Sequence, residues 1–276
     1  MFVDGAFKCC PKFFIQLYTV HGMRNGHYIP LVYALLNGKS EDKYRSFWND
    51  LLTICTERNL QLKPSIIHVD FEQAMHNVLK EIASDAQLKC CRFHLVQEWW
   101  RKIQSVGLSN EYKNTESQLG KWLKCFFGLQ FVDAVEVEDI FVDLMSVAPD
   151  DEKCIKFADY LVENYVANDS KFPPSLWAEI PSDEKRTNNA AESYHAHLNE
   201  QLYSPHPTIF VFMDAVQKLL SVSYVKMRGS DTQALTRRTE REKYQFLMRQ
   251  YNKLLSGEID RSECVRSLGY RYSASF

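Results

Sequence analysis

The succession of strand and helix patterns in the first third of the chain constrains its fold most. The chain begins extended over Met1–Lys8, and Phe13–Val20 has the aromatic and β-branched composition of a buried strand. After the tight turn at Asn25-Gly26, Tyr28–Leu36 is the returning strand of a hairpin-like meander. The first three strands are therefore expected to be antiparallel neighbours.

The elements that follow alternate between helix and strand. Apolar residues recur at helical spacing from Tyr44 to Cys55, and the short apolar strand Ile66–Val69 comes next. A second helix over Ala74–Ile82 precedes Leu88–Phe93, which we expect to be a fifth strand. Strands joined through helices pair in parallel with right-handed crossovers. The sequence therefore predicts an α/β fold with a mixed five-stranded sheet.

The rest of the chain has the pattern of successive helices. From Leu95 to Pro181 there is no strand signal, and within this stretch Phe131–Glu152 carries eight acidic residues and no lysine or arginine. A last set of helices runs from Asn188 to the end. We expect a core that begins with residues 1–94, an all-α insertion over 95–186, and a closing helix with C-terminal helices over 187–276.

Composition excludes several classes of protein. With 45% hydrophobic and 25% charged residues, the chain is neither disordered nor collagenous. The 33 Lys and Arg residues nearly balance the 35 Asp and Glu residues, so nucleic-acid binding would depend on local patches. There is no signal-peptide pattern and no apolar run of the roughly 20 residues that cross a membrane. The adjacent pairs Cys9-Cys10 and Cys90-Cys91 suit a reducing compartment, so we expect an intracellular protein.

Three acidic residues stand out by their position. Asp4 lies in the first strand, and Asp70 follows the strand Ile66–Val69 at the edge where open α/β sheets bind ligands. Asp70 could instead cap the next helix, with Gln73 completing a capping box. Glu192 lies in a helix where it could be a solvated residue, but that helix also carries a stripe of short polar side chains suited to an organised site. The stripe consists of Asn188, Glu192, His195 and Asn199.

Other motifs have two interpretations each. Cys91 and His94 have the spacing of half a metal site, or they are a buried cysteine and a hydrogen-bonded histidine at a strand end. In Trp99-Trp100-Arg101-Lys102 the aromatic rings could stack bases beside Arg101 and Lys102, or they could belong to the core. The basic stretch Lys226–Lys253 is either a phosphate-contacting surface or a solvated helical face. Its DNA-binding candidates are Arg237, Arg238 and Arg241.

Taken together, five motifs resemble the MULE (Mutator-like element) transposase domain, a DDE transposase with a ribonuclease-H-like fold. The likeness covers about Phe2 to Leu202, and its motifs occur in the order of that family. They are Val3-Asp4-Gly5-Ala6-Phe7-Lys8, Phe14-Ile15-Gln16-Leu17-Tyr18-Thr19-Val20-His21, Val69-Asp70-Phe71-Glu72-Gln73-Ala74, Cys91-Arg92-Phe93-His94 and Thr187-Asn188-Asn189-Ala190-Ala191-Glu192-Ser193.

The resemblance implies a specific activity. Asp4, Asp70 and Glu192 would be the catalytic acids that bind two Mg²⁺ (or Mn²⁺) ions, and Cys91 and His94 would be the CxxH signature. Asn188, Asn189 and His195 would support the site, and the helical stretch would be the insertion before the last catalytic helix. The expected substrate is the double-stranded DNA of transposon ends, which implies a nuclear protein and self-association on paired ends.

Two alternatives differ in what they predict. The chain begins three residues before Asp4 and has no upstream zinc-finger module of the kind such transposases often carry. This favours, as the main alternative, a truncated or domesticated copy that binds DNA or protein without turnover. The other alternative is a ribonuclease-H-like nuclease that cleaves RNA–DNA hybrids with the same metal chemistry.

Overall fold

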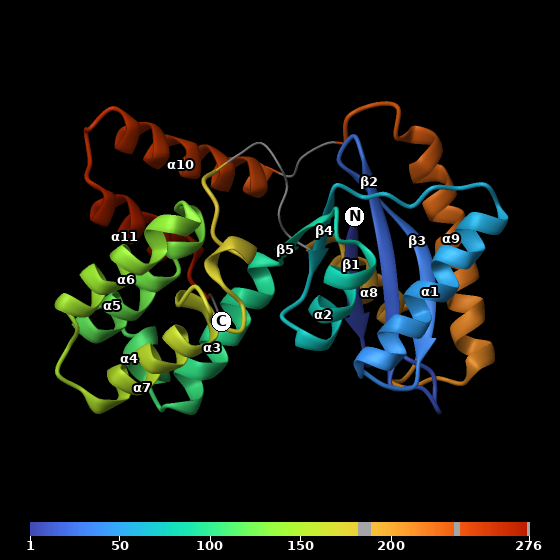
Figure 1. Cartoon of the computed structure of the whole chain (residues 1–276), viewed down its shortest axis with the longest axis horizontal. Helices are drawn as coiled ribbons and strands as arrows, with labels where there is room; N and C mark the ends of the chain where they lie inside the picture. Colours follow the sequence, from blue (N-terminus) through green and yellow to red (C-terminus); the bar gives the residue numbers. More distant parts are fainter. Residues whose placement is uncertain (182–188, 235–237, 275–276) are drawn as a thin grey trace. The chain divides into compact units, whose positions relative to one another are not determined.

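The computed structural model describes residues 1–181, 189–234 and 238–274, with only the backbone of 189–193 (Figure 1). Contacts within the chain divide it into two units. The first comprises Met1–Cys91 with Arg186–Leu235, and the second comprises Arg92–Lys185 with Thr236–Phe276. Residues 236–276 therefore group with the residues of the predicted insertion, whereas we expected them to group with the closing helix.

A five-stranded mixed sheet forms the centre of the first unit, as predicted. Its strands lie in the order β3-β2-β1-β4-β5. β2 is antiparallel to both β1 and β3, whereas β4 is parallel to both β1 and β5. The strands are β1 (Phe2–Ala6), β2 (Gln16–Arg24), β3 (His27–Leu36), β4 (Ile66–Val69) and β5 (Gln87–Cys90).

The predicted end of the fifth strand is wrong by three residues. β5 ends at Cys90, and helix α3 begins at Arg92, so Phe93 is helical. The backbone N–H of Cys91 still donates to the carbonyl of Val69 at 2.9 Å, which extends the parallel ladder by one residue beyond the strand. The aromatic Phe93 suits a strand by propensity, but it falls in the first turn of the helix that follows.

Helices cover both faces of the sheet because residues along β2 alternate in direction. Tyr18 contacts the rings of Tyr44 and Phe47, so one face packs against α1 (Glu41–Glu57) and its neighbour α2 (Gln73–Ile82). Leu17 points the other way and packs against α8 (Asn189–Glu200) and α9 (Ile209–Gly229). This alternation is the ordinary period of two along a strand.

The second unit is helical wherever it is described, in agreement with the absence of strand signals. Its α-helices are α3 (Arg92–Ser105), α4 (Ser109–Lys113), α5 (Gln118–Phe126), α6 (Val137–Ser146), α7 (Glu152–Leu161), α10 (Arg238–Leu255) and α11 (Arg261–Tyr272). Short turns of other helix types complete it: η1 (Leu129–Phe131), η2 (Ala134–Glu136), η3 (Val162–Val166) and η4 (Pro174–Leu176). In the described part of the chain, no helix has both the length and the apolar character required to cross a membrane.

Aromatic side chains form the core of the second unit. Trp99 is fully buried, and its ring contacts those of Phe127, Tyr165 and Trp177. Trp100 is also buried, with 5% of its surface exposed. The core interpretation of the two tryptophans is therefore correct, and neither ring is displayed on a surface where bases could stack on it.

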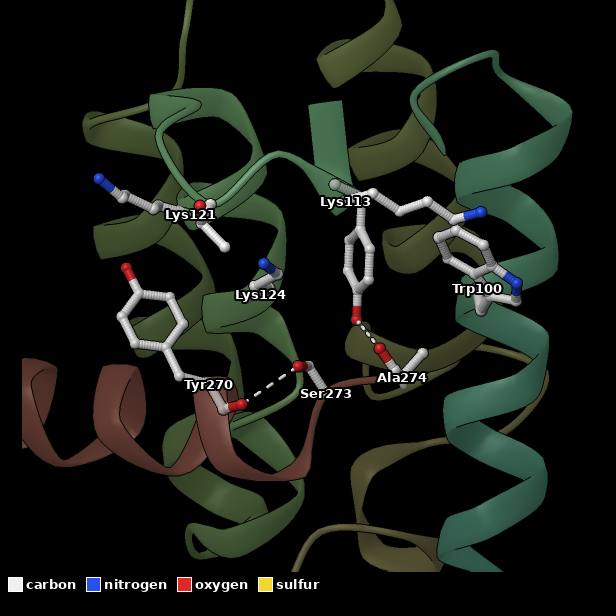
Figure 2. A pocket seen from close by; sticks show the side chains of 9 residues that line it. Trp100, Lys113, Lys121, Lys124, Tyr270, Ser273 and Ala274 are labelled. Carbon is white, nitrogen blue, oxygen red and sulfur yellow. Dashed lines mark hydrogen bonds between the residues drawn. The ribbon is translucent and has the colours of Figure 1, made fainter. Parts of the chain in front are cut away.

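Two glycines allow α5 and α11 to approach closely. A Cβ atom on Gly269 of α11 would lie 2.4 Å from the carbonyl oxygen of Lys124 in α5. A Cβ atom on Gly128, just after α5, would lie 2.0 Å from the carbonyl oxygen of Val265. Figure 2 shows Lys124 and the end of α11 at Tyr270 side by side. Backbone contact, rather than interdigitated side chains, therefore sets the spacing of these helices.

We expect Gly269→Ala to destabilise the second unit by about 1–3 kcal/mol, because the new methyl group would push a backbone carbonyl away. Gly229→Ala is the matched control, since a Cβ atom on this helical glycine would have no neighbour within 4 Å. The control should stabilise the protein by at most about 1 kcal/mol, because alanine has a higher helix propensity than glycine. Urea unfolding of both variants followed by circular dichroism measures the difference, and equal midpoints would contradict the close-packing argument.

Candidate active site

Parallel pairing of β1 with β4 brings two of the predicted acids to the same level. Phe2 of β1 is paired with His68 of β4, and counting two residues along each chain places Asp4 beside Asp70. Asp70 directly follows the last residue of β4. Both acids line one small cavity of about 50 Å³. The structure therefore brings Asp4 and Asp70 together, although they are far apart in the sequence.

Glu72 is a third carboxylate on this cavity, which the sequence analysis did not select. Burial raises the pKa of Glu72, and the ammonium group of Lys39 opposes this shift. Lys39 is the one cation among the lining residues, and its Nζ lies 4.0 Å from the centre of the Phe7 ring. Three acids and one lysine give the cavity a negative balance that favours a bound cation. The remaining lining residues are Val3, Gly5, Gln16, Tyr18 and Met75.

Gln16 adds an unsatisfied oxygen to the same cavity. Its Nε2 donates to the carbonyl of Gly38 at 3.2 Å and to the hydroxyl of Tyr44 at 2.8 Å, which assigns the two ends of the amide. The Oε1 atom is buried and accepts no hydrogen bond from the described residues. A Cβ atom on Gly5 would lie 2.7 Å from this oxygen, so glycine at position 5 leaves room for the Gln16 amide.

The Asp4 carboxylate is held from two sides. Its Oδ1 accepts the backbone N–H of Gly5 at 2.9 Å, and its Oδ2 lies 3.2 Å from Nδ1 of His195 in α8. Both side chains are buried, with 5% of Asp4 and 7% of His195 exposed. A buried carboxylate requires such partners, because an unpaired charge in the interior is costly. His195 thus faces the sheet rather than solvent.

A buried chain of polar groups continues from His195 into β2. Nε2 of His195 lies 2.9 Å from Oγ1 of Thr19, and Nε2 of His21 lies 3.0 Å from the same oxygen. Burial lowers the pKa of His21 to about 3, so its ring is neutral near pH 7. The Thr19 hydroxyl also lies 3.3 Å from the carbonyl oxygen of Asp4, and its one proton can serve either that oxygen or His195. With the proton directed at His195, His21 donates to Thr19 and Nδ1 of His195 donates to Asp4.

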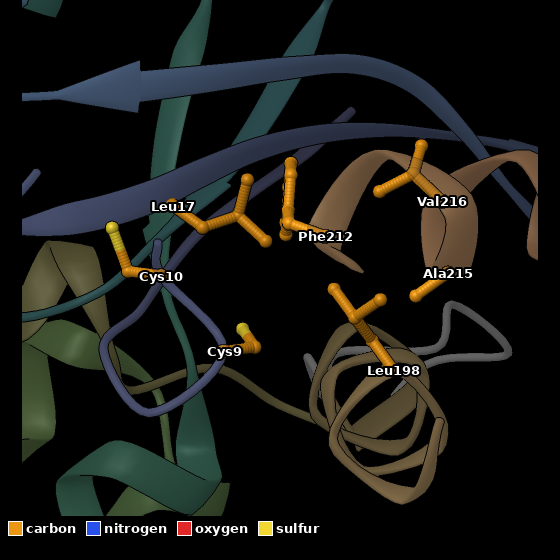
Figure 3. Packing of buried hydrophobic residues seen from close by; sticks show 7 residues of the cluster. All are labelled: Cys9, Cys10, Leu17, Leu198, Phe212, Ala215 and Val216. Atoms are coloured by element: carbon orange, nitrogen blue, oxygen red, sulfur yellow. The ribbon is translucent and has the colours of Figure 1, made fainter. Parts of the chain in front are cut away.

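Apolar packing fixes α8 against the sheet beside this polar chain. Leu198, three residues after His195, is fully buried in a cluster that includes Cys9, Leu17 and Phe212 (Figure 3). Also in α8, the Tyr194 hydroxyl lies 2.6 Å from the hydroxyl of Tyr33. The remaining buried members of the cluster are Cys10, Ala215 and Val216.

Three predicted residues of the α8 region lie partly or wholly outside the described residues. Asn188 is outside them. Asn189 is the first residue of α8 and Glu192 follows within it, but their side chains are not among those described. The backbone of Glu192 is therefore in a helix that packs against β1, the strand of Asp4.

The alternative interpretation of Asp70, as the cap of the following helix, is wrong. Helix α2 begins at Gln73, its N-cap residue is Glu72, and the cap makes no side-chain hydrogen bond. Asp70 precedes the helix, and its Oδ1 accepts the backbone N–H of Phe71 at 2.6 Å. His76 reaches back from α2, and its Nε2 donates to the carbonyl of Asp70 at 2.7 Å, which fixes the end of β4.

Cys91 and His94 are separated by the boundary between the two units. Cys91 is a buried free thiol that ends the first unit, whereas His94 lies in the first turn of α3. Within the described ranges, no group of three or more His, Cys, Asp or Glu side chains is placed to hold one metal ion. The side chain of Glu192 lies outside that search.

The predicted DNA-binding cations have varied surroundings. Arg101 forms an ion pair with Glu98 in the same helix. The Nζ atom of Lys102 lies 4.8 Å from the centre of the Tyr160 ring. In α10, Nε of Arg238 lies 2.7 Å from Glu242. Arg241 is exposed, and Arg237 lies outside the described residues.

Sequence comparison bears on the first part of the chain. Residues 1–98 match the family model of the MULE transposase domain, which confirms the resemblance over those residues. A transposase-related function follows for this segment. Neither the search of curated proteins nor the search of solved structures gave a match.

Some site residues were missed although the sequence contained a signal for them. Thr19 lies in the strand predicted to be buried, Phe13–Val20, and His21 directly follows that predicted strand. Both are buried, and buried polar residues need partners. Glu72 is only two residues after Asp70 at the same sheet edge. Gln16 is also a polar residue of the predicted strand Phe13–Val20, but its place on the cavity depends on the space left by Gly5 on the neighbouring strand, which the sequence does not show.

We expect His21 to make the protein sensitive to acid. Its lowered pKa means that the unfolded chain takes up a proton below about pH 6.5, whereas the folded protein does not until about pH 3. Stability should therefore fall as the pH decreases through this window. His21→Gln should reduce that fall by about 1.4 kcal/mol per pH unit in the steepest region.

Urea unfolding at several values between pH 7 and pH 4 measures this effect. Glutamine can still donate to Thr19, so the variant should fold. His197→Gln, at an exposed position of α8, is the control for the substitution itself. Parallel pH profiles for His21→Gln and the unaltered protein would show that His21 does not contribute.

Proposed function

We propose that this chain contains the catalytic domain of a Mutator-like DDE transposase with a ribonuclease-H-like core. It would cleave DNA phosphodiester bonds and transfer the strands with two Mg²⁺ (or Mn²⁺) ions. The observation that carries the proposal is the β1–β4 register, which sets Asp4 beside Asp70 on one acidic cavity. The mixed sheet and the MULE match over residues 1–98 support it.

The cavity carries oxygen atoms of the kind that bind a magnesium ion, although among the described residues no three Asp, Glu, His or Cys side chains are placed around one ion position. Asp4, Asp70 and Glu72 supply carboxylates, and the unsatisfied Oε1 of Gln16 supplies an amide oxygen. These are the hard ligands that Mg²⁺ prefers. Among the described residues, no cysteine or histidine lines the cavity, and Met75 contributes the only sulfur atom to its lining. When bound, the ions would supply an activated water and stabilise the leaving oxygen.

His195 provides the argument for Glu192 as the third acid of the triad. Glu192 lies three residues before His195 in α8, and residues three apart share one face of a helix. His195 on that face contacts Asp4 of β1. Three residues correspond to a rise of about 4.5 Å along the helix between Glu192 and His195, and we propose on this ground that Glu192 is the third acid.

The protein's own contribution is the positioning of charge. Gly5 and His195 fix the two oxygens of Asp4, and the N–H of Phe71 fixes one oxygen of Asp70. Asp4 lies within the central strand β1 and Asp70 directly follows β4, so both carboxylates have defined positions before substrate binds. Such preorganised electrostatics is the main source of rate in phosphoryl transfer.

The remaining parts of the proposal follow from the substrate. Double-stranded DNA at transposon ends would be bound in part by Arg101, Lys102, Arg237, Arg238 and Arg241. A protein that acts on genomic DNA would work in the nucleus. Action on paired ends would require self-association, which analytical ultracentrifugation with and without DNA can measure.

We expect Asp4→Asn, Asp70→Asn and Glu192→Gln each to lower Mg²⁺-dependent DNA nicking at least about a hundredfold, because each removes a ligand charge. Nicking of supercoiled plasmid is the measurement. Asp139→Asn, in α6 of the second unit, is the matched control and should leave the rate unchanged.

Two outcomes would contradict the proposal. Nicking that persists in a chelator would exclude the metal mechanism. Purified protein that binds DNA but does not nick it with any divalent ion would instead identify a non-catalytic regulator.

We expect His195 to act as a positioning residue for Asp4. His195→Asn can keep an N–H near the place of Nδ1 and so preserve the contact with Asp4, whereas His195→Gln can only keep one near Nε2. The asparagine variant should therefore retain several-fold more of the nicking rate, and the glutamine variant should need more Mg²⁺ for half-maximal rate. Equal Mg²⁺ dependence in two variants of equal stability would assign His195 a purely structural role.

A further inference from the structure

The second unit contains a cavity that the proposed active site does not use. Its volume is about 540 Å³, within the range of about 300–1,000 Å³ typical of ligand pockets. Residues of α3, α4, α5 and the end of α11 line it (Figure 2). Its lining includes Lys113, Lys121 and Lys124 but no acidic side chain. This is unusual in a protein whose acids slightly outnumber its lysines and arginines.

The three ammonium groups lack a carboxylate partner. Within the described residues, none of them forms an ion pair. Lys121 and Lys124 are three residues apart in α5 and so share one helix face. Figure 2 shows their ammonium groups spread across the pocket, with those of Lys113 and Lys121 on opposite sides and that of Lys124 between them, so the positive charge extends over the lining.

Aromatic rings hold two of these cations at the cavity. The Nζ atom of Lys124 lies 5.2 Å from the centre of the Tyr112 ring, and that of Lys113 lies 5.9 Å from the centre of the Trp100 ring. The Tyr112 hydroxyl donates to the carbonyl of Ala274 at 3.0 Å, which ties the end of α11 to this wall. The cationic wall is thus preformed by packing between distant segments.

Tyr270 indicates which kind of anion suits the pocket. Its ring lines the cavity and is 42% exposed, so a planar group can stack on it. The hydroxyl groups of Thr115 and Ser273 lie on the same lining. Lysines that contact phosphate beside an exposed aromatic ring are the combination that binds a nucleic-acid strand, where phosphates pair with cations and bases stack.

We propose that this pocket binds nucleotide units, with phosphate on the three lysines and a base against Tyr270. The ligand is a stretch of single-stranded nucleic acid or a free nucleotide, which share this chemistry. The site lies wholly in the second unit and involves none of the proposed catalytic acids. Nucleotide binding at this pocket can therefore be tested independently of DNA cleavage.

The test uses the full chain in a chelator, with two probes: a fluorescein-labelled dT12 oligonucleotide and the mononucleotide dTMP. The pocket variant combines Lys113→Gln, Lys121→Gln and Lys124→Gln. The control variant combines Lys153→Gln, Lys156→Gln and Lys171→Gln, which removes the same charge from the same unit at positions that do not line the pocket.

We expect the pocket variant to bind dT12 at least tenfold more weakly in 0.1 M salt, and the control variant to bind as the unaltered protein does. The logarithm of the dT12 association constant decreases linearly with the logarithm of the salt concentration, and this decrease should be less steep by about 2 in the pocket variant. Each lost phosphate contact removes about 0.7 from the steepness for a single strand. Tyr270→Leu should weaken dT12 binding about tenfold without changing the slope.

The outcomes separate the ligand sources and the failure of the proposal. Saturable dTMP binding that the pocket variant loses identifies a free nucleotide, and lysine-dependent binding of dT12 alone identifies a strand. Equal weakening in the pocket and control variants, or binding of neither probe, overturns the assignment. Because the assay contains no divalent ion, these results do not depend on whether the chain nicks DNA.

Discussion

The parallel pairing of β1 with β4 is the constraint on which the rest of the site depends. The register that joins Phe2 to His68 sets Asp4 level with Asp70. The antiparallel strands β2 and β3 extend the sheet on one side of this pair, and β5 extends it on the other. A shift of one residue would turn Asp4 to the opposite face, away from its partners. The acidic cavity is thus a product of sheet register.

The second determinant is how a buried carboxylate is stabilised. Asp4 is buried, and the chain satisfies it with the Gly5 N–H and with His195 from α8. His195 in turn requires Thr19, which lies beside His21 in the same strand. The packing of α8 against the sheet and the orientation of Asp4 therefore depend on each other, because leaving either Asp4 or His195 unpaired in the interior would cost free energy. The contact between His195 and Asp4 therefore also sets the position of the α8 backbone relative to β1.

The second unit is organised by different forces. Its core is a set of aromatic contacts around Trp99, and α5 meets α11 through glycines at backbone distance. Among the described residues, no acidic residue lines the pocket of this unit, whereas three lysines do, and two of them lie over aromatic rings. Charge is therefore segregated within the unit even though the chain as a whole is almost neutral. Local arrangement, rather than net charge, determines which partner it can bind.

The sequence by itself determined the succession of strands and helices, the helical character of the insertion and the motifs that carry the acids. These features follow from local periodicity and turn residues, which short-range interactions decide. It could not show that Glu72 and Gln16 line the acidic cavity or that Glu72, rather than Asp70, is the N-cap residue of α2. Nor could it show that Trp100 and Tyr270 line the same pocket. Those results depend on strand register and helix packing between distant segments, and no local pattern in the chain encodes such distances.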